Sequence, residues 1–492
     1  MKRKLIYIVI IFYAASLMLS STAAARNGSA DVDHSGKAEP SVVNWCLIGD
    51  PPEDMAAVTK KANEYIRNKL NAEIHFDFMG WDNYAHKKRM YYSAGEPMDI
   101  VFTASWLNYD LEASNGYYFP LDGLIDEFAP ETRAILGESV LKAAEVEDRI
   151  YALPVPGQCN ASASGIKFRK DMVKKYNIDL SKIKKLEDVE PVLKLIKSKQ
   201  PSIIPLFNGS QTLNFDILNM ENFEGGLKSP GSLNITGKDY KVYNEFTKPE
   251  LKTFFKTLNK FHKLGYLKTP KDKNNIAELN KAFAILNTDL TPVYDEYDRN
   301  VEWVNIYLAR PSINHSSATA CMDAISSKTE DPEMDMKLLE LINTDTYLNN
   351  LLHFGIEGKH YVKVSQNVIT HPKDKDFSTP QYLYWMLGNR YLDFTFSYED
   401  KNIHQALKDF NNAAIDNKAI GFKFESVYVS KESVACYDIW NQYIPKFING
   451  EYDPDKYIPI MNNAFKSAGA DKIIAEKQKQ LDVWLDSQYL VR

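Results

Sequence analysis

Residues 99–126, DIVFTASWLNYDLEASNGYYFPLDGLID, decide how this chain is interpreted. The apolar run at 100–102 predicts a buried β-strand, and Trp106, Asn108 and Tyr109 follow it closely. Open α/β sheets bind ligands outside the carboxyl ends of their strands. Aromatic rings beside amides and carboxylates suit sugars, whose C–H faces stack on rings while their hydroxyls need polar partners. The segment therefore predicts either a strand-end binding site or a core strand leading into a tyrosine-rich surface loop.

The residues before this stretch follow a strand–helix–strand pattern. Residues 42–48 predict a short buried strand that ends in Gly49-Asp50, and residues 55–70 carry apolar side chains at helical spacing. Alternating apolar residues at 74–78 predict a second strand, which leads to Trp81. Strands that alternate with helices indicate a mainly parallel, doubly wound sheet. Asp50, Trp81 and the segment after Trp106 are therefore expected to form one wall of a cleft.

A chain of 492 residues is too long for a single core, and a second α/β pattern follows residues 150–154. The elements expected in it are helices at 168–176, 186–199, 251–264 and 277–283 and strands at 203–207 and 303–308. A long helical region begins at Pro332, and residues 381–492 are expected to be mostly helical. These patterns predict two α/β lobes followed by a helical C-terminal region.

The amino terminus has the pattern of an export signal. Lys2, Arg3 and Lys4 precede an apolar stretch at 5–19, and three alanines at 23–25 supply a small-residue cleavage pattern. The apolar stretch is shorter than the roughly 20 residues of a membrane helix. We therefore expect a signal peptide at 1–25 and a flexible tether at 26–41, with an uncleaved amino-terminal anchor as the alternative.

Composition excludes some partners and leaves the cysteines unassigned. The formal net charge is −6, and removing the three basic residues of the signal makes the chain more acidic, which argues against nucleic acid as a partner. Four cysteines, Cys46, Cys159, Cys321 and Cys436, are widely spaced and form no metal-binding motif. Cys46 lies in an apolar strand, where a buried free thiol is expected, and no disulfide is assigned.

No sequence motif indicates catalysis. The chain has no GxSxG elbow, no HExxH and no phosphate-binding loop. A glycoside hydrolase needs only two carboxylates that meet in space, so 65 acidic residues leave that class open without favouring it. We therefore expect no enzyme, no catalytic residues, no metal and no cofactor.

Several segments resemble the extracellular solute-binding proteins of ABC importers, in the family-1, carbohydrate-type cluster. In the first half these are DIVFTASWLNYD (99–110), YFPLDGLIDEFAPET (118–132), DRIYALP (148–154), FRKDMVKKYNID (168–179) and LEDVEPVLKLIK (186–197). The second half, with the segment 324–361, GFKFESVYV at 421–429 and the segment 449–484, resembles a Gram-positive subgroup with a C-terminal domain of unassigned function. Most relatives carry a lipobox cysteine after the signal peptide. Here no cysteine lies near Ala25, so a lipid anchor is not implied.

The resemblance implies a two-lobed periplasmic-binding-protein-like α/β fold of type II, with a largely helical C-terminal region. The first lobe would span 42–152, completed by about 311–365, and the second 153–310, completed by part of 366–448, with the helical region at 380–492. Such a protein is exported, extracellular or associated with the cell surface, and monomeric. It closes on a small solute, here expected to be a mono- or oligosaccharide, and delivers it to ABC permease subunits.

Eleven residues are candidates for contact with the solute: Asp50, Trp81, Trp106, Asn108, Tyr109, Gln158, Trp303, Glu357, Tyr361, Trp385 and Asn389. Each has a structural alternative. Asp50 suits a hydroxyl pair but would equally cap the helix that follows it, and the tryptophans suit stacking or core packing. Trp385 and Asn389 are expected one turn apart on a helix. A secreted glycan-active hydrolase, and a binding protein for a peptide or other small solute, are the alternative functions.

Overall fold

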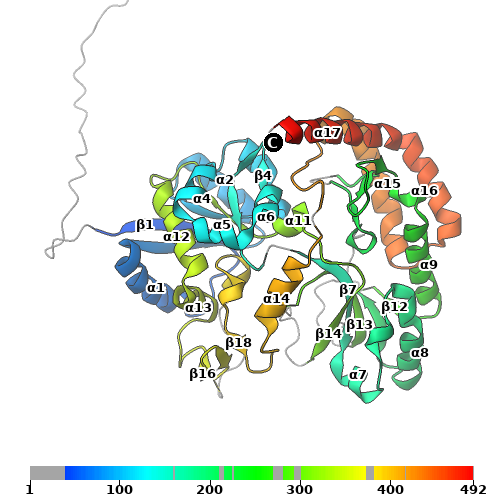
Figure 1. Cartoon of the computed structure of the whole chain (residues 1–492), viewed down its shortest axis with the longest axis horizontal. Coiled ribbons are helices and arrows are strands. Elements are labelled where there is room, and N and C mark those ends of the chain that lie inside the picture. Colours follow the sequence, from blue (N-terminus) through cyan, green and yellow to red (C-terminus); the bar gives the residue numbers. More distant parts are fainter. Residues whose placement is uncertain are drawn as a thin grey trace, which may run out of the picture.

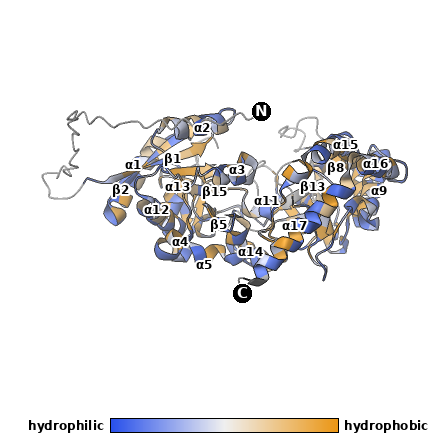
Figure 2. Cartoon of the chain, turned by 90° about the horizontal axis from the view of Figure 1, so that it is seen from above, coloured by the Kyte–Doolittle hydropathy of each residue, from blue (hydrophilic) through white to orange (hydrophobic). Residues whose placement is uncertain are grey.

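The apolar residues 42–48 form strand β1 (Ser41–Ile48), an inner strand of the first of two five-stranded sheets. The computed structural model describes residues 39–158, 161–209, 215–223, 227–269, 281–292, 301–372, 382–415 and 417–490. The expected signal peptide, most of the tether and Cys159 lie outside these ranges. Each sheet is covered by helices, and the two layered units lie side by side as two lobes (Figures 1 and 2).

The first sheet has the strand order β2-β1-β3-β15-β6. Its other strands are β2 (Ala72–Met79), β3 (Ile100–Thr103), β6 (Ala152–Pro154) and β15 (Met322–Ile325). Strand β1 pairs in parallel with β2 and β3, as the sequence predicts. Strand β15 is antiparallel to both β3 and β6, because the chain enters it on its return from the second lobe. The sheet is therefore mixed rather than wholly parallel.

The carboxyl ends of β1, β2 and β3 lie at one edge of this sheet, which is where open α/β sheets bind ligands. Ile48 and Met79 pair at the carboxyl ends of β1 and β2. At the same edge Thr103, the last residue of β3, pairs with Met322, and Met322 pairs with Pro154. The chain leaves the lobe after Pro154 and re-enters it at Met322. The carboxyl ends of the parallel strands thus share one edge with the connections to the second lobe.

Helices cover both faces of the first sheet (Figure 1). They are α1 (Met55–Leu70), α2 (Tyr84–Ala94), α3 (Tyr109–Ser114), α4 (Asp122–Phe128), α5 (Pro130–Leu136), α6 (Glu138–Ala143), α12 (Pro332–Thr344) and α13 (Thr346–Phe354). A small sheet of β16 (Val362–Ser365), β17 (Val368–Thr370) and β18 (Thr395–Phe396) follows α13. Leu383, Met386 and Leu387 also pack into this lobe's core. We propose that part of 366–448 completes the first lobe as well as the second.

The second sheet has the order β12-β8-β13-β7-β14. Its strands are β7 (Ala163–Arg169), β8 (Ile204–Asn208), β12 (Leu267–Lys268), β13 (Ala282–Leu290) and β14 (Trp303–Tyr307). Helices α7 (Lys170–Lys175), α8 (Glu190–Lys199) and α9 (Pro249–Lys263) pack with it, and a smaller sheet holds β9 (Met220–Glu221), β10 (Ser232–Asn234) and β11 (Val242–Tyr243). The expected helix at 277–283 is wrong from residue 282 onward, because that apolar run is a central strand whose pairing with β8 and β7 overrides local periodicity.

Three segments cross between the lobes in the described part of the chain, and they pair with one another. Ser162 and Ser312 exchange two backbone hydrogen bonds of 3.1 and 3.0 Å. Ser312 also forms a parallel bridge with Ile415, whose N–H donates to the Pro311 carbonyl at 2.8 Å. The lobe bounds expected from the sequence place a third crossing near residue 365, and in the structure it runs later in the chain, through α14 (Ile403–Asn412). The three segments form a hinge of paired backbones.

The C-terminal helices α15 (Ser430–Ile448), α16 (Pro454–Ala468) and α17 (Ala470–Leu490) belong to the second lobe (Figure 1). Their apolar faces enter the core of that lobe, where the Phe246 ring lies 5.5 Å from both Trp440 and Phe465. Phe255 stacks on Phe447 at 4.7 Å. Cys46 and Cys436 are free, buried thiols, as expected for Cys46, and Cys321 is buried as well.

Asp335, on α12, makes stability depend on pH. Burial raises the pKa of its carboxyl to about 7, although the Thr329 hydroxyl donates to it at 2.6 Å. The folded state therefore holds this proton more tightly than the unfolded chain, so stability falls as pH rises from about 4 to about 7. We predict that Asp335→Asn is more stable than the wild type by about 2–4 kcal/mol at pH 8, with almost no gain at pH 4, in urea unfolding.

Glu333→Gln, on the exposed side of the same helix, is the matched control and should change stability by less than about 0.5 kcal/mol at either pH. An equal effect of Asp335→Asn at the two pH values would contradict the assignment of a buried, protonated carboxyl.

Candidate ligand-binding site

Three indole rings meet at the edge of the first sheet from which the crossover segments leave. Trp81 follows β2, Trp106 lies in the short helix η1 (Ser105–Leu107) after β3, and Trp385 ends the short helix η6 (Tyr382–Trp385). The Trp81 ring centroid lies 6.1 Å from that of Trp106 and 5.7 Å from that of Trp385, at 17° in both pairs. We call these three residues the indole platform.

The platform is held in place by the protein but faces solvent. Trp81 is 57% and Trp106 50% exposed, whereas Trp385 is partly buried and meets Phe102 edge-on at 5.2 Å. The Trp106 Nε1–H donates to the Ala320 carbonyl on a crossover segment at 2.7 Å. Large aromatic rings that are both fixed and exposed are unusual in a soluble domain, and they offer flat apolar surface to a ligand.

Asp50 and Asn108 add polar groups at the same edge of the sheet. Asp50 follows β1 and is exposed, and the residue that precedes α1 is Asp54, so Asp50 does not cap that helix. Asn108 is exposed and adopts a left-handed conformation (φ 63°) between η1 and α3, where asparagine is tolerated better than most residues. We retain both as proposed hydrogen-bonding groups.

Tyr109 points the other way, into the core of the first lobe. Its side chain is fully buried, and its hydroxyl donates to the Ala144 carbonyl at 2.6 Å. The same oxygen accepts a hydrogen bond from the Tyr151 amide at 3.2 Å. We therefore leave Tyr109 out of the proposed site, because α3 begins at this residue and turns its ring inward.

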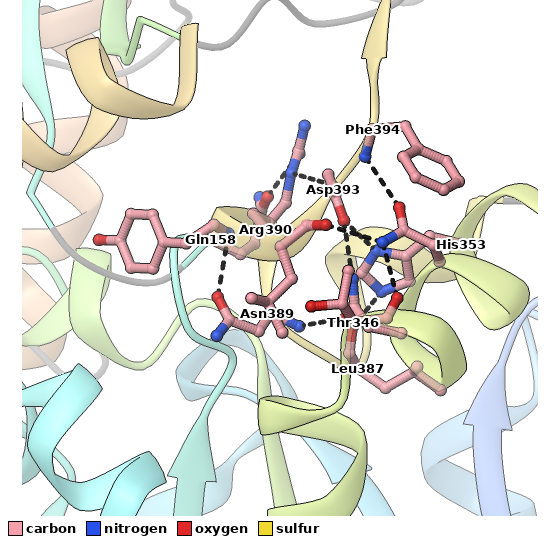
Figure 3. A network of polar contacts seen from close by, with 12 residues as sticks. Gln158, Thr346, His353, Leu387, Asn389, Arg390, Asp393 and Phe394 are labelled. Carbon is pink, nitrogen blue, oxygen red and sulfur yellow. Dashed lines mark hydrogen bonds and ion pairs between the residues drawn. The ribbon is translucent and has the colours of Figure 1, made fainter. Parts of the chain in front are cut away.

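Gln158 and Asn389 belong to a polar network that also holds Arg390 and Asp393 (Figure 3). The Arg390 guanidinium donates to Gln158 Oε1 at 3.0 Å and lies 4.2 Å above the Tyr384 ring. Asn389 is 1% exposed, with its Nδ2 donating to the Asn343 carbonyl at 2.8 Å. The expected helical pair with Trp385 is wrong, because a turn at Gly388 separates η6 from the next short helix η7 (Arg390–Leu392).

A buried ion pair anchors this turn to α13. His353 Nδ1 lies 2.6 Å from Asp393 Oδ1, and His353 Nε2 lies 2.8 Å from the Leu387 carbonyl oxygen. A carbonyl oxygen can only accept a hydrogen bond, so the Nε2–H of His353 donates to Leu387. Burial alone would raise the pKa of Asp393, but the charge and hydrogen bond of His353 outweigh it and hold that pKa below its usual value.

The other three candidates lie away from the platform. Trp303 pairs with Arg169 at the end of the second sheet remote from the crossovers, which join at Ala163 and after Tyr307. Glu357 is exposed and forms an ion pair with Lys363 at 3.1 Å. Tyr361 is buried among Ile369, Phe396 and neighbouring aromatics, and burial raises its pKa to about 12. We omit these three from the proposed site.

Arg390, Tyr384 and Ala320 take part in the arrangement but were missed from the sequence. The signal for Arg390 and Tyr384 is weak, since an arginine and a tyrosine near a tryptophan in YLYWMLGNRY are common in cores. No grouping of three or more His, Cys, Asp or Glu side chains suited to a metal occurs among the described residues. In that same part of the chain, no helix is long and apolar enough to cross a membrane.

The fold is similar to that of two-lobed solute-binding proteins, and the comparisons with known proteins point to the same class. A family model described as a domain of unknown function, DUF3502, matches residues 418–486. A carbohydrate ABC transporter substrate-binding protein of Streptococcus pneumoniae is 29% identical over 466 residues, which cover 91% of each chain.

Solved structures agree with this class. The N-glycan transport solute binding protein NgtS of Streptococcus pneumoniae superimposes with a TM-score of 0.81 at 26% identity, over 91% of this chain and 100% of NgtS. NgtS in complex with Man1GlcNAc and with Man5GlcNAc gives TM-scores of 0.70 and 0.68, at 26% and 27% identity. Each covers 91% of this chain and 100% or 99% of NgtS. These findings confirm the resemblance to carbohydrate-type solute-binding proteins of ABC importers and the two-lobed fold.

The turn at Gly388 should tolerate no side chain. Gly388 has φ 80°, and a Cβ there would lie 2.5 Å from His353 Nε2 and 2.6 Å from Asn349 Oδ1. We predict that Gly388→Ala destabilises the protein by about 2 kcal/mol or more, visible as a lower melting temperature in calorimetry.

Gly123→Ala is the control, because a Cβ at Gly123, within α4, meets nothing within 4 Å and alanine favours the helix. Its melting temperature should equal or exceed that of the wild type. Equal melting of the two variants would contradict the role assigned to the turn.

Proposed function

We propose that this protein is the extracellular substrate-binding subunit of an ABC importer and that it binds an oligosaccharide of the N-glycan type reversibly between its lobes. The similarity to NgtS and to the carbohydrate substrate-binding protein supports this class of ligand over a peptide. A membrane permease pair is the proposed recipient. Binding and release need no bond cleavage, which agrees with the relatives being substrate-binding components rather than enzymes.

The observation that carries the proposal is the indole platform. Sugar rings expose patches of C–H groups that stack on flat aromatic faces, while their hydroxyls require hydrogen-bonding partners. Trp81 and Trp106 provide the exposed faces, and Asp50 supplies a carboxylate at the same edge of the sheet. Because both Trp81 and Trp106 are exposed, we propose that the ligand is an oligosaccharide with more than one sugar ring in contact with the platform.

We infer that the described arrangement is nearer to the ligand-free form. It superimposes better on the NgtS structure that is named without a glycan (0.81) than on the Man1GlcNAc and Man5GlcNAc complexes (0.70 and 0.68). Backbone pairs such as Ser162–Ser312 join the lobes through narrow segments, which suits rotation of one lobe against the other. Glycan binding would then favour a more closed arrangement.

Replacement of Trp81 tests the site. Trp81→Ala should weaken binding of Man5GlcNAc by roughly tenfold or more in isothermal titration calorimetry, since loss of a central aromatic anchor costs about 2 kcal/mol. Tyr428→Ala, at a 73% exposed aromatic residue on the C-terminal region, is the control and should bind within about twofold of the wild type.

The same titrations decide between the functional classes. Absence of binding to any of a panel of mannose- and GlcNAc-containing glycans would contradict the proposed ligand, and tighter binding of peptides would favour the peptide alternative. If Man5GlcNAc were converted to smaller products in the calorimeter's sample cell, the hydrolase alternative would be favoured instead.

A further inference from the structure

The C-terminal region, residues 418–490, is fixed to the second lobe by a shared core. Helices α15, α16 and α17 place Trp440, Phe447, Phe465 and Ile473 in the same apolar core as β7, β8 and α9. The buried ammonium of Lys477 donates to the Asn222 and Gly231 carbonyls of the second lobe, both at 3.0 Å. A packed core of this kind does not deform when lobes rotate.

The start of this region also reaches the first lobe. Lys423 forms an ion pair with Asp110 on α3, one turn after Trp106 of the platform. His315 lies on the crossover segment that returns to the first lobe. Its Nε2 is 3.3 Å from Asp110 Oδ2, and its Nδ1 is 2.8 Å from the Ala143 carbonyl oxygen. Asp110 therefore joins the first lobe, the hinge and the C-terminal region.

The end of the region makes a second contact with the first lobe. Helix α17 runs from the second lobe toward α6 of the first (Figure 1). Lys142 on α6 donates to Gln488 Oε1 at 2.5 Å, and its ammonium lies 5.5 Å above the Trp484 ring. The backbone at Gly421 packs against Lys142 as well, since a Cβ there would come within 3.1 Å of the lysine Cγ.

Apolar contacts lie between the Lys423–Asp110 ion pair and the Lys142–Gln488 hydrogen bond. Ile420 packs against the core of the first lobe. Two residues later, Phe422 contacts Trp484 at 5.9 Å and Phe223 of the second lobe at 4.9 Å. The segment 420–423 therefore lies between the lobes and contacts both.

We propose that the C-terminal region is a brace that stabilises the more open arrangement of the lobes, through Lys423–Asp110 at one end and Gln488–Lys142 at the other. This inference rests on the proposed function, in which the more open arrangement is the form without bound glycan. Because the brace moves with the second lobe, rotation that closes the lobes displaces both contacts. Hydrogen bonds of this kind are lost once their atoms separate beyond about 3.5 Å.

The brace then opposes glycan binding. If only a fraction of the protein populates the closed arrangement, the apparent affinity is lowered by that fraction, and weakening the brace removes part of this loss. Partly buried charge-assisted hydrogen bonds are stronger than exposed pairs. Removing both contacts should shift the equilibrium between open and closed forms by about threefold to tenfold.

The test is a double variant, Lys142→Met with Lys423→Met. We expect a smaller radius of gyration than the wild type in small-angle X-ray scattering without ligand. Affinity for Man5GlcNAc in calorimetry should rise by about threefold to tenfold. Lys472→Met is the control, because Lys472 pairs with Glu432 inside the C-terminal region at 2.8 Å and joins no lobes. It should change neither quantity.

An unchanged radius of gyration, or unchanged or weaker glycan affinity in a folded variant, would overturn the brace. If the double variant melts early, Gln488→Ala near the chain end removes one contact alone, and about a twofold gain in affinity is then expected. If the wild type binds no glycan, the proposed function fails, while scattering of the ligand-free proteins still decides whether the brace holds the lobes apart.

Discussion

The pairing of Met322 with both Thr103 and Pro154 is the constraint on which the rest of the structure depends. It inserts a strand that arrives from the second lobe between two strands of the first. The carboxyl ends of β1, β2 and β3 consequently share an edge with the chain crossings. Any loop that follows one of those strands is held beside the hinge. Trp81 follows β2 and Trp106 follows β3, so this pairing places two of the three platform rings beside the hinge.

The lobes are joined in two physically different ways. Near the platform the connection is backbone pairing, in which Ser162, Ser312 and Ile415 come from three distant parts of the chain. At the C-terminal region the connection is made by side chains, chiefly Lys423 and Lys142. Backbone pairing can twist without breaking, whereas charge-assisted contacts are made or lost over a short distance. A ligand that alters the angle between the lobes would therefore have to break the side-chain contacts of Lys423 and Lys142.

The local sequence pattern was sufficient to predict a strand or helix where the environment of its residues is set by that element itself. The strands around Trp45 and Phe102 and the helix from Met55 were predictable because continuous or periodic apolar residues have few alternatives. Prediction failed at β13, where an apolar run reads equally well as helix or strand until its neighbours are known. Local pattern was also insufficient at Tyr109, since a tyrosine after a strand has the same pattern whether its ring turns outward or inward.

The sequence by itself determined the α/β class, the order of most elements and the position of Trp81 and Trp106 just beyond two strands. Those features depend on residues a few positions apart. Only the tertiary structure decided that Trp385 joins these two rings, that Asn389 and Tyr109 are internal, and that the C-terminal helices complete the second lobe. Burial and ring stacking are set by contacts between distant segments, and one sequence without its fold does not specify which segments meet.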